Sequence, residues 1–171
     1  MTKTISLLCG LLLSGGAGAD GDNVAMMLRT DGAYLRLAVD DANSVYAGVH
    51  FFQSRYSSRY RGMTPQYSSP GIALGYRYAR DRAQRMRPHI DTLLAYSDDR
   101  NDAYDISSDD SRTRGIEFSL AYGVEYRMSP SFSIDAKVGL LYTHDKTTGA
   151  VQNSYDSFYA PVTVLGLNYY F

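Results

Sequence analysis

Three histidines are the residues of this chain best suited to acid–base or nucleophilic chemistry: His50, His89 and His144. Nucleophilic catalysis requires a nucleophile and a base within hydrogen-bond reach of each other. No such pair is evident, because His144 is followed by Asp145 and Lys146 and a serine nucleophile is missing. The sequence also shows no cluster of histidine and cysteine at metal-ligand spacing. We therefore expect no enzyme activity, no metal and no cofactor.

Charged side chains recur on one face of several alternating segments, and their signs balance. We expect this polar face to form an interior charge network of Arg36, Arg77, Asp91, Glu117, Glu125, Arg127, Asp135 and Lys137, with Arg29 and Asp40 completing five positive and five negative groups. Buried charges are tolerated when they are paired and hydrogen-bonded. Across a turn at Ser129, Glu125 is expected diagonally beside Lys137. We favour a salt-bridge plug over the alternative, a gated ion pathway.

Two polar segments have opposite charge. Residues 54–69 contain no acidic residue and carry the set that we assign to surface recognition: Arg55, Tyr56, Arg59, Tyr60, Arg61 and Tyr67. Residues 98–114 hold six aspartates and three arginines. Tyrosine combined with serine and arginine is typical of adaptable recognition surfaces. We expect these segments to be loops that bind a surface ligand; solvated loops without a dedicated ligand are the alternative.

Composition excludes several classes of protein. The chain has 171 residues with a formal net charge of −1, which argues against a nucleic-acid binder. No apolar run approaches the roughly 18 residues that a membrane-spanning helix requires. Sixteen tyrosines and six phenylalanines are spread through the sequence, which favours short aromatic-rich strands over disorder.

Residues 1–19 have the three parts of a secretory signal peptide. Lys3 is the positive charge, residues 5–13 are a short apolar stretch, and Ala17-Gly18-Ala19 is a small-residue cleavage site. A buried N-terminal helix is one alternative and lipidation at Cys9 is another, although Leu8 occupies the position where a small residue is needed. We expect cleavage after Ala19, which leaves residues 20–171 as one domain without cysteine.

The remaining chain is patterned with a period of two, which is typical of strands. In residues 132–144, for example, Ile134, Ala136 and Val138 alternate with Asp135 and Lys137. Eight segments share this pattern: residues 23–29, 33–40, 44–56, 71–78, 87–97, 116–127, 132–144 and 157–171. In the last segment Tyr159 is expected on the same face as Leu165. The first segment is short, so whether it is a full strand is open.

Alternation alone does not separate a soluble sandwich from a membrane barrel. Three features favour the barrel: a polar face rich in glycine, alanine and serine, strands of about 10–14 residues, and turns that alternate between short and long. The sequence therefore predicts an all-β fold, an eight-stranded antiparallel up-and-down transmembrane β-barrel. The interior of such a barrel is just filled by side chains.

The chain resembles the small eight-stranded outer-membrane barrels of Gram-negative bacteria, of the OmpX/Ail, opacity-protein and OmpA transmembrane-domain type. The resemblance covers residues 23–171 and includes the ending Leu165-Gly166-Leu167-Asn168-Tyr169-Tyr170-Phe171. It implies that Leu165, Leu167, Tyr169 and Phe171 form the signal presented to the barrel-assembly machinery. Two barrel enzymes of this size act on lipid A, and the deacylase family has a His-x-Ser arrangement that His144 lacks. His50 and His89 are expected to face inward, away from a lipid substrate.

We therefore expect a plugged outer-membrane barrel that serves envelope integrity or surface interaction. A narrow channel is the second interpretation, and a lipid A-modifying enzyme is the third. The expected partners are outer-membrane lipid, lipopolysaccharide, the assembly machinery and a host or surface ligand at the loops. An even strand number places both termini on the periplasmic side. Residues 30–32, 57–69, 98–113 and 145–156 would then be extracellular, and residues 41–43, 80–86 and 129–131 periplasmic.

Overall fold

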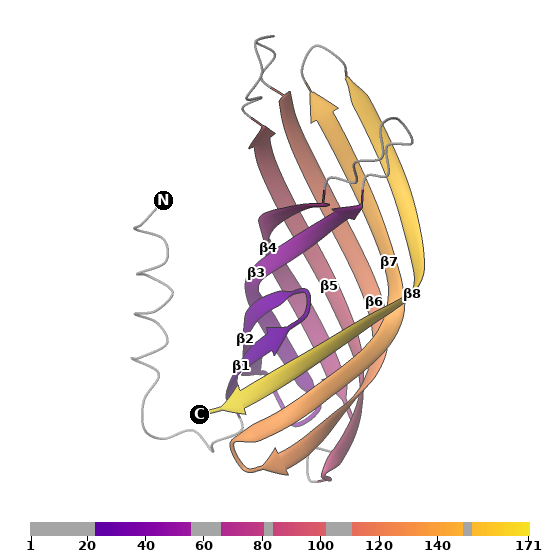
Figure 1. The fold of residues 1–171 in the computed structure, drawn as a ribbon. Coiled ribbons are helices and arrows are strands. Elements are labelled where there is room, and N and C mark those ends of the chain that lie inside the picture. The colour runs from indigo at the N-terminus through magenta and orange to yellow at the C-terminus, as the bar shows by residue number, and fades with distance from the viewer. Residues whose placement is uncertain (1–22, 56–65, 81–83, 102–110, 149–151) are drawn as a thin grey trace.

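The computed structural model describes residues 23–55, 66–80, 84–101, 111–148 and 152–171. Eight antiparallel strands close into a barrel in chain order (Figure 1). Their bounds are β1 Val24–Arg29, β2 Gly32–Ala38, β3 Asn43–Arg55, β4 Gln66–Ala79, β5 Met86–Asn101, β6 Ser111–Ser129, β7 Phe132–Thr148 and β8 Asn153–Tyr170. Within these ranges no helix is long and apolar enough to cross a membrane. The predicted fold class is confirmed. The predicted signal peptide, residues 1–19, lies outside the described residues.

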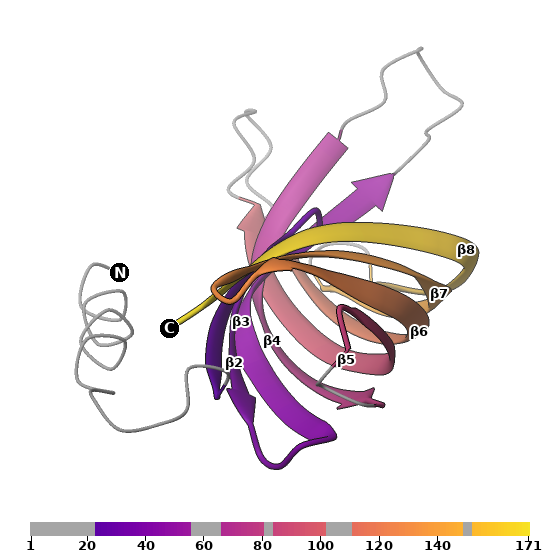
Figure 2. The same ribbon diagram turned by 90° about the horizontal axis from the view of Figure 1, so that it is seen from below.

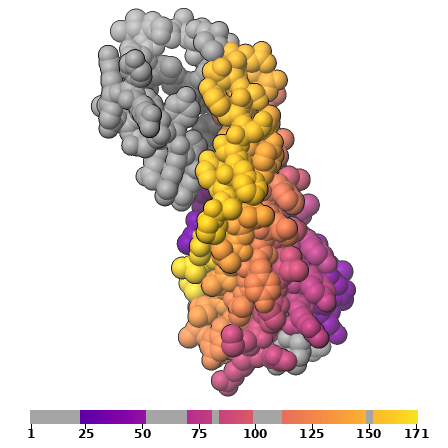
Figure 3. All heavy atoms as spheres, turned by 90° about the vertical axis from the view of Figure 1, so that its right-hand side faces the viewer, coloured from indigo at the N-terminus to yellow at the C-terminus, as the bar shows by residue number. Residues whose placement is uncertain are grey.

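The barrel is apolar outside and polar inside. Outward side chains such as Ile72 and Leu74 are 70% and 61% exposed, whereas Arg77 and Asp91, which face the lumen, are 1% and 0% exposed. The space-filling view shows the outer wall formed by the later strands (Figure 3). Because side chains alternate along each strand, one face of the sequence pattern forms the outer wall and the other forms the lumen.

The strands are strongly tilted, as the view from below shows (Figure 2). Following the paired residues from Leu28 of β1 through each strand in turn leads, after one circuit of the barrel, to Asp156 of β8. Leu28 itself pairs with Leu167 of β8. Asp156 lies eleven positions before Leu167, and a register shift between Gly139 and Leu141 takes up one of them. The resulting shear of ten over eight strands corresponds to a tilt of about 43°.

Several strands are longer than predicted at one end of the barrel. The strand β4 begins at Gln66, β5 continues to Asn101 and β6 begins at Ser111, inside segments that we expected to be loops. Polar residues occupy both faces there, so no alternation marks these parts of the strands. The short first segment is a strand, and β1 closes the barrel by pairing with both β2 and β8.

The predicted face of Tyr159 is wrong. The extra residue of β8 opposite Leu140 reverses the alternation, because Val162 pairs with Gly139 but Tyr159 pairs with Leu141. Tyr159 therefore shares the inner face with Leu141, and its neighbour Phe158 faces outward, 65% exposed. One added residue moves every following side chain to the opposite face of the sheet.

Candidate functional site

The lumen is organised around Arg77 of β4. Its guanidinium contacts Asp135 Oδ2 at 2.6 Å, Asp91 Oδ2 at 2.9 Å and Glu125 Oε2 at 3.2 Å. Asp91 is its direct partner on β5, and Glu125 and Asp135 are direct partners of each other on β6 and β7. Two carboxylates placed opposite each other repel, so the arginine between them is what makes this arrangement stable.

Three further cations surround the same carboxylates. Lys137 Nζ lies 2.6 Å from Asp91 Oδ1, and Arg36 Nη1 lies 3.0 Å from Glu125 Oε2. Arg29 Nη1 lies 3.7 Å from Asp91 Oδ1, and its Nη2 also pairs with Asp31. With Arg77, four cations thus face the four carboxylates of Asp31, Asp91, Glu125 and Asp135. We call these eight residues the ionic core.

Neutral donors add hydrogen bonds to the carboxylates of the ionic core. Tyr46 Oη donates to Asp91 Oδ1 at 2.6 Å, and Ser133 Oγ donates to Glu125 Oε1 at 2.7 Å. The hydroxyl of Tyr170 also donates to Glu125. Sequence reasoning missed these three residues, although their parity places them on the inner face. The pattern of charged residues identifies arginine, lysine, aspartate and glutamate, but it does not identify neutral hydrogen-bond donors.

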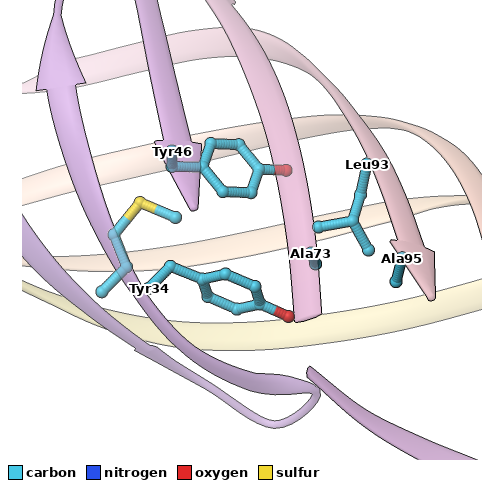
Figure 4. Packing of buried hydrophobic residues seen from close by; sticks show 6 residues of the cluster. Tyr34, Tyr46, Ala73, Leu93 and Ala95 are labelled. Atoms are coloured by element: carbon cyan, nitrogen blue, oxygen red, sulfur yellow. The ribbon is translucent and has the colours of Figure 1, made fainter. Parts of the chain in front are cut away.

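An apolar layer borders the ionic core. It consists of Met27, Tyr34, Tyr46, Ala73, Leu93 and Ala95, and the close-up shows the two tyrosine rings side by side (Figure 4). The ring centroids lie 5.5 Å apart at 81°, an edge-to-face contact. Gly75 makes room for this arrangement, since a Cβ atom at that position would lie 2.0 Å from Tyr46 Cζ.

The buried histidines belong to the polar interior. His50 Nε2 lies 3.0 Å from Glu117 Oε1, and His50 Nδ1 shares a hydrogen bond of 2.7 Å with Tyr34 Oη. His89 Nε2 lies 3.3 Å from Asp135 Oδ1. Both histidines are 2% exposed and face inward, as their parity suggested. The structure therefore places Glu117 in a separate pair with His50.

Two further residues predicted for the interior charge network, Asp40 and Arg127, lie outside the ionic core. Asp40 is exposed and accepts hydrogen bonds from the backbone N–H groups of Ala42 and Asn43, because β2 ends before it and a tight turn follows.

The register places Glu125 diagonally beside Lys137, as predicted, because Glu125 pairs with Asp135. The ion pairs of the two residues are made with other partners: Glu125 contacts Arg36 and Arg77, and Lys137 contacts Asp91.

Arg127 lies at the edge of the barrel instead of at its centre. It is half-buried, its Nε donates to the carbonyl oxygen of Ser129 at 3.3 Å, and its guanidinium lies 4.8 Å from the centroid of the Tyr170 ring. Arg127 lies two residues before the end of β6, beside the β6–β7 turn, and the carbonyl oxygens of Ser129 and Pro130 accept hydrogen bonds from its guanidinium.

Outside the apolar belt, the long strands carry exposed ion pairs. Arg112 Nε lies 2.6 Å from Asp98 Oδ1, and this hydrogen bond lowers the pKa of Asp98 below its ordinary value. His144 Nδ1 lies 2.8 Å from Asp156 Oδ1, and Tyr142 donates to the same oxygen at 2.6 Å. The hydrogen bonds from Tyr142 and His144 lower the pKa of Asp156.

The remaining predicted site residues fall in two places. Arg55 ends β3 and Tyr67 lies in β4, but their side chains lie outside the described set, as do Tyr56, Arg59, Tyr60 and Arg61 entirely. The C-terminal residues Leu165, Leu167, Tyr169 and Phe171 are exposed on the outer face, and the rings of Tyr169 and Phe171 meet edge to face at 5.3 Å. In the described part of the chain, no group of three or more His, Cys, Asp or Glu side chains is arranged to hold a metal.

Comparisons with known proteins support the fold. No family model matches the sequence, and no curated protein matches it. A similar solved structure is the N-terminal β-barrel domain of OprF from Pseudomonas aeruginosa, with 15% sequence identity and a TM-score of 0.52. The match covers 89% of this chain and 100% of that domain. At this identity the similarity shows that the chain has the fold of a small outer-membrane barrel; a relationship to the OmpX/Ail, opacity-protein or OmpA families stays a prediction.

Proposed function

We propose that this protein is an integral outer-membrane barrel whose lumen is closed by side chains, and that it serves envelope integrity or surface interaction rather than catalysis. The observation that carries the proposal is the ionic core. Arg77, at 1% exposure, joins three carboxylates from three other strands, so the lumen is spanned by paired charges at its centre. Such a set is stable only while each charge keeps its partners.

The outer surface supports the membrane location. Large apolar side chains are exposed on every strand, among them Leu28, Leu74, Leu94, Leu120, Leu140 and Leu167. A soluble protein rarely exposes such a continuous apolar surface, whereas a membrane barrel needs an apolar band about 25 Å tall. Aromatic residues at the lower edge of this surface, Tyr78, Tyr126 and Tyr169, suit the interfacial girdle.

A non-catalytic role agrees with the surroundings of the histidines. His50 and His89 are buried beside carboxylates, and His144 contacts Asp156 at the outer rim. A lipid-modifying role would need a nucleophile at hydrogen-bond distance from one of them. Lipid A from cells with and without the protein provides the check by mass spectrometry: an acyl-chain difference abolished by His144→Ala would contradict the proposal.

Gel migration and fractionation test the membrane assignment. A barrel folded in detergent migrates differently before and after boiling. We expect the mature chain to show this shift and to fractionate with the outer membrane. A chain that fractionates as soluble and shows no shift would refute the assignment.

We further propose that both termini are periplasmic and that the opposite rim recognises a partner, either lipopolysaccharide or a surface ligand. The arginines and tyrosines of residues 55–67 are the proposed recognition set, and their basic composition suits phosphate groups. Protease added to intact cells is expected to cut first within residues 57–69 or 98–113, where arginines lie in the proposed outer loops. Cutting confined to residues 80–87 would mean that the orientation is inverted.

The C-terminal residues are proposed to act in delivery to the assembly machinery. Their alternation and the exposed Phe171 suit a signal read before the barrel closes. Deleting Phe171 is expected to lower the amount of assembled barrel far more than the stability of barrel already folded. Equal losses in both would make Phe171 an ordinary girdle aromatic.

A further inference from the structure

The outward face of β6 marks where the apolar belt ends. From Tyr126 back to Ile116 every outward residue is apolar or aromatic. At about 3.3 Å per residue and a tilt of about 43°, this stretch covers about 24 Å along the barrel axis, close to the apolar band of a membrane barrel. Arg114 is the next outward residue. It therefore lies at the boundary of the belt, at the end of the barrel opposite the C-terminus (Figure 1).

A row of hydrogen-bond donors begins at this boundary. Arg114 of β6 pairs with Lys146 of β7, and Lys146 pairs with Ser154 of β8. All three residues are exposed and lie on the outward face of their strands. We call them the donor row. Arginine and lysine side chains can only donate hydrogen bonds, and the serine hydroxyl can donate as well, so three neighbouring strands present donors side by side.

The two cations of the donor row are direct neighbours across the β6–β7 ladder. Residues opposite each other on antiparallel strands have Cβ atoms about 4.5–5.5 Å apart, and like charges in this position repel. In the ionic core the opposed carboxylates of Glu125 and Asp135 share Arg77 as their counter-ion. Among the side chains that the structure describes, none forms an ion pair with Lys146. An anion bound over Arg114 and Lys146 would relieve their repulsion.

Two carboxylates beside the donor row are engaged by other groups. Asp98 is opposite Arg114 on β5, but its Oδ2 lies 3.9 Å from Arg114 Nε, whereas Arg112 Nε donates to its Oδ1 at 2.6 Å. Asp156 Oδ1 lies 2.8 Å from His144 Nδ1. The three cations at positions 112, 114 and 146 therefore outnumber these two carboxylates, and the patch keeps a positive charge.

A phosphate group carried by a lipid suits this patch. Phosphate offers several acceptor oxygens, and its hydrogen bonds with arginine and lysine are charge-assisted. It can therefore accept from Arg114 and Lys146 at the same time. Below the donor row, Phe118, Tyr142 and Phe158 are exposed on the same three strands and pair with one another in register. These rings provide an apolar surface for acyl chains, whereas a free anion would make no use of them.

We infer that the donor row binds a phosphate group of lipid A, the lipid anchor of lipopolysaccharide in the outer leaflet, while the acyl chains of that lipid lie against Phe118, Tyr142 and Phe158. The inference rests on the proposed membrane location and orientation. It assigns a lipopolysaccharide site to the outer wall of the barrel, apart from the recognition set of residues 55–67.

Titration of the purified barrel with lipid A tests this inference. The refolded protein is kept in a nonionic detergent, diphosphoryl lipid A is added, and native mass spectrometry counts the lipid molecules bound. The test variant combines Arg114→Gln with Lys146→Gln. The matched control combines Arg80→Gln with Arg85→Gln, which removes two exposed arginines at the opposite end of the barrel. Migration before and after boiling verifies that each variant is folded.

We expect the unaltered protein and the control to bind diphosphoryl lipid A with the same affinity, and the test variant to bind it about tenfold more weakly. Equal affinities of the test variant and the control would overturn the inference. Equal binding of dephosphorylated lipid A to the unaltered protein would also overturn it. Displacement of lipid A by an equal concentration of inorganic phosphate would mean that the site takes the free anion and not the lipid.

A substitution of opposite sign sharpens the test. Asp98→Asn removes the carboxylate nearest in register to Arg114, so we expect it to strengthen the binding of diphosphoryl lipid A. Weaker binding by this variant would contradict an anionic ligand at the donor row.

Failure of this inference and failure of the proposed function are distinguishable. Binding in detergent does not depend on the direction in which the barrel is inserted, so a negative result there contradicts the lipid A site and leaves the membrane location standing. Fractionation as a soluble protein, or protease cutting confined to residues 80–87, would instead contradict the proposed location or orientation, and with it the leaflet from which the lipid comes.

Discussion

The lower part of the barrel buries its ion pairs, whereas the upper part exposes them. Below the Thr30–Asp31 turn every strand has two neighbours, and the Arg77–Asp91 pair is shielded from water on all sides. Above it, β8 has one neighbour in the described chain, and the Arg112–Asp98 pair has side-chain exposures of 44% and 28%. An arginine–carboxylate pair at the surface contributes little, whereas breaking a buried one leaves a charge without compensation.

The contrast shows that the side chains that fill the lumen do not depend on the pairing of strands in the upper wall. The ionic core needs only the lower parts of the strands, where side chains from all of them converge. The wall above can therefore lose two strands without opening a path through the centre. Stability is expected to reside in the lower part, and adaptable surface in the upper part.

The largest expected effect comes from removing the central cation. Arg77→Leu leaves Asp91, Glu125 and Asp135 buried near one another without the arginine, and we expect the free energy of unfolding to fall by about 3–5 kcal/mol. Arg112→Leu removes the same group from an exposed pair and should lower the unfolding midpoint only slightly. Urea titration of both variants in lipid vesicles, followed by circular dichroism, measures the difference. Equal losses would contradict the contrast between the two parts.

A smaller effect is expected from crowding the apolar layer. Gly75→Ala would place a methyl group 2.0 Å from Tyr46 Cζ, and we expect a loss of about 1–3 kcal/mol. The control is Gly166→Ala, where the nearest atom is Arg29 Cγ at 2.9 Å, so the overlap of the added methyl group is smaller. In the same urea titration, the free energy of unfolding should be lower for Gly75→Ala than for Gly166→Ala. The reverse order would mean that Tyr46 does not pack as described.

The smallest effect concerns the titration of Asp98. Its pKa is lowered mainly by the hydrogen bond from Arg112, so the folded protein holds the proton less tightly than the unfolded chain. The pair therefore stabilises the fold above the ordinary pKa of aspartate, and this contribution is lost as the pH falls through the lowered value. Arg112→Leu should return the pKa of Asp98 toward its ordinary value in an NMR titration. An unchanged pKa would exclude the described pair.

Much of the fold could be predicted because a period of two survives in every strand near the membrane. The inward parity of Arg77, Asp91 and Lys137 was readable for the same reason. Parity does not give the position of a residue along the barrel axis. That position depends on the shear, which decides which inward side chains contact one another. Lys137 therefore reaches Asp91 on β5 instead of Glu125 on its own hairpin.

The parts that sequence reasoning missed have local physical causes. The extra residue of β8 opposite Leu140 moves Tyr159 to the inner face, and only the proline at position 161 hints at an irregular edge. The outer ends of β4, β5 and β6 are polar on both faces, so no pattern separates them from loops. Uncharged partners such as Tyr46 and Ser133 carry no signal beyond their parity.

Planar-bilayer recording tests the central claim, that the ionic core closes the lumen, most directly. The refolded mature protein is inserted into the bilayer, and insertion is verified independently by protease protection. We expect no discrete conductance from the unaltered chain over a wide range of voltage. A reproducible single-channel step from the unaltered, fully folded protein would contradict the closed lumen and would favour a narrow channel.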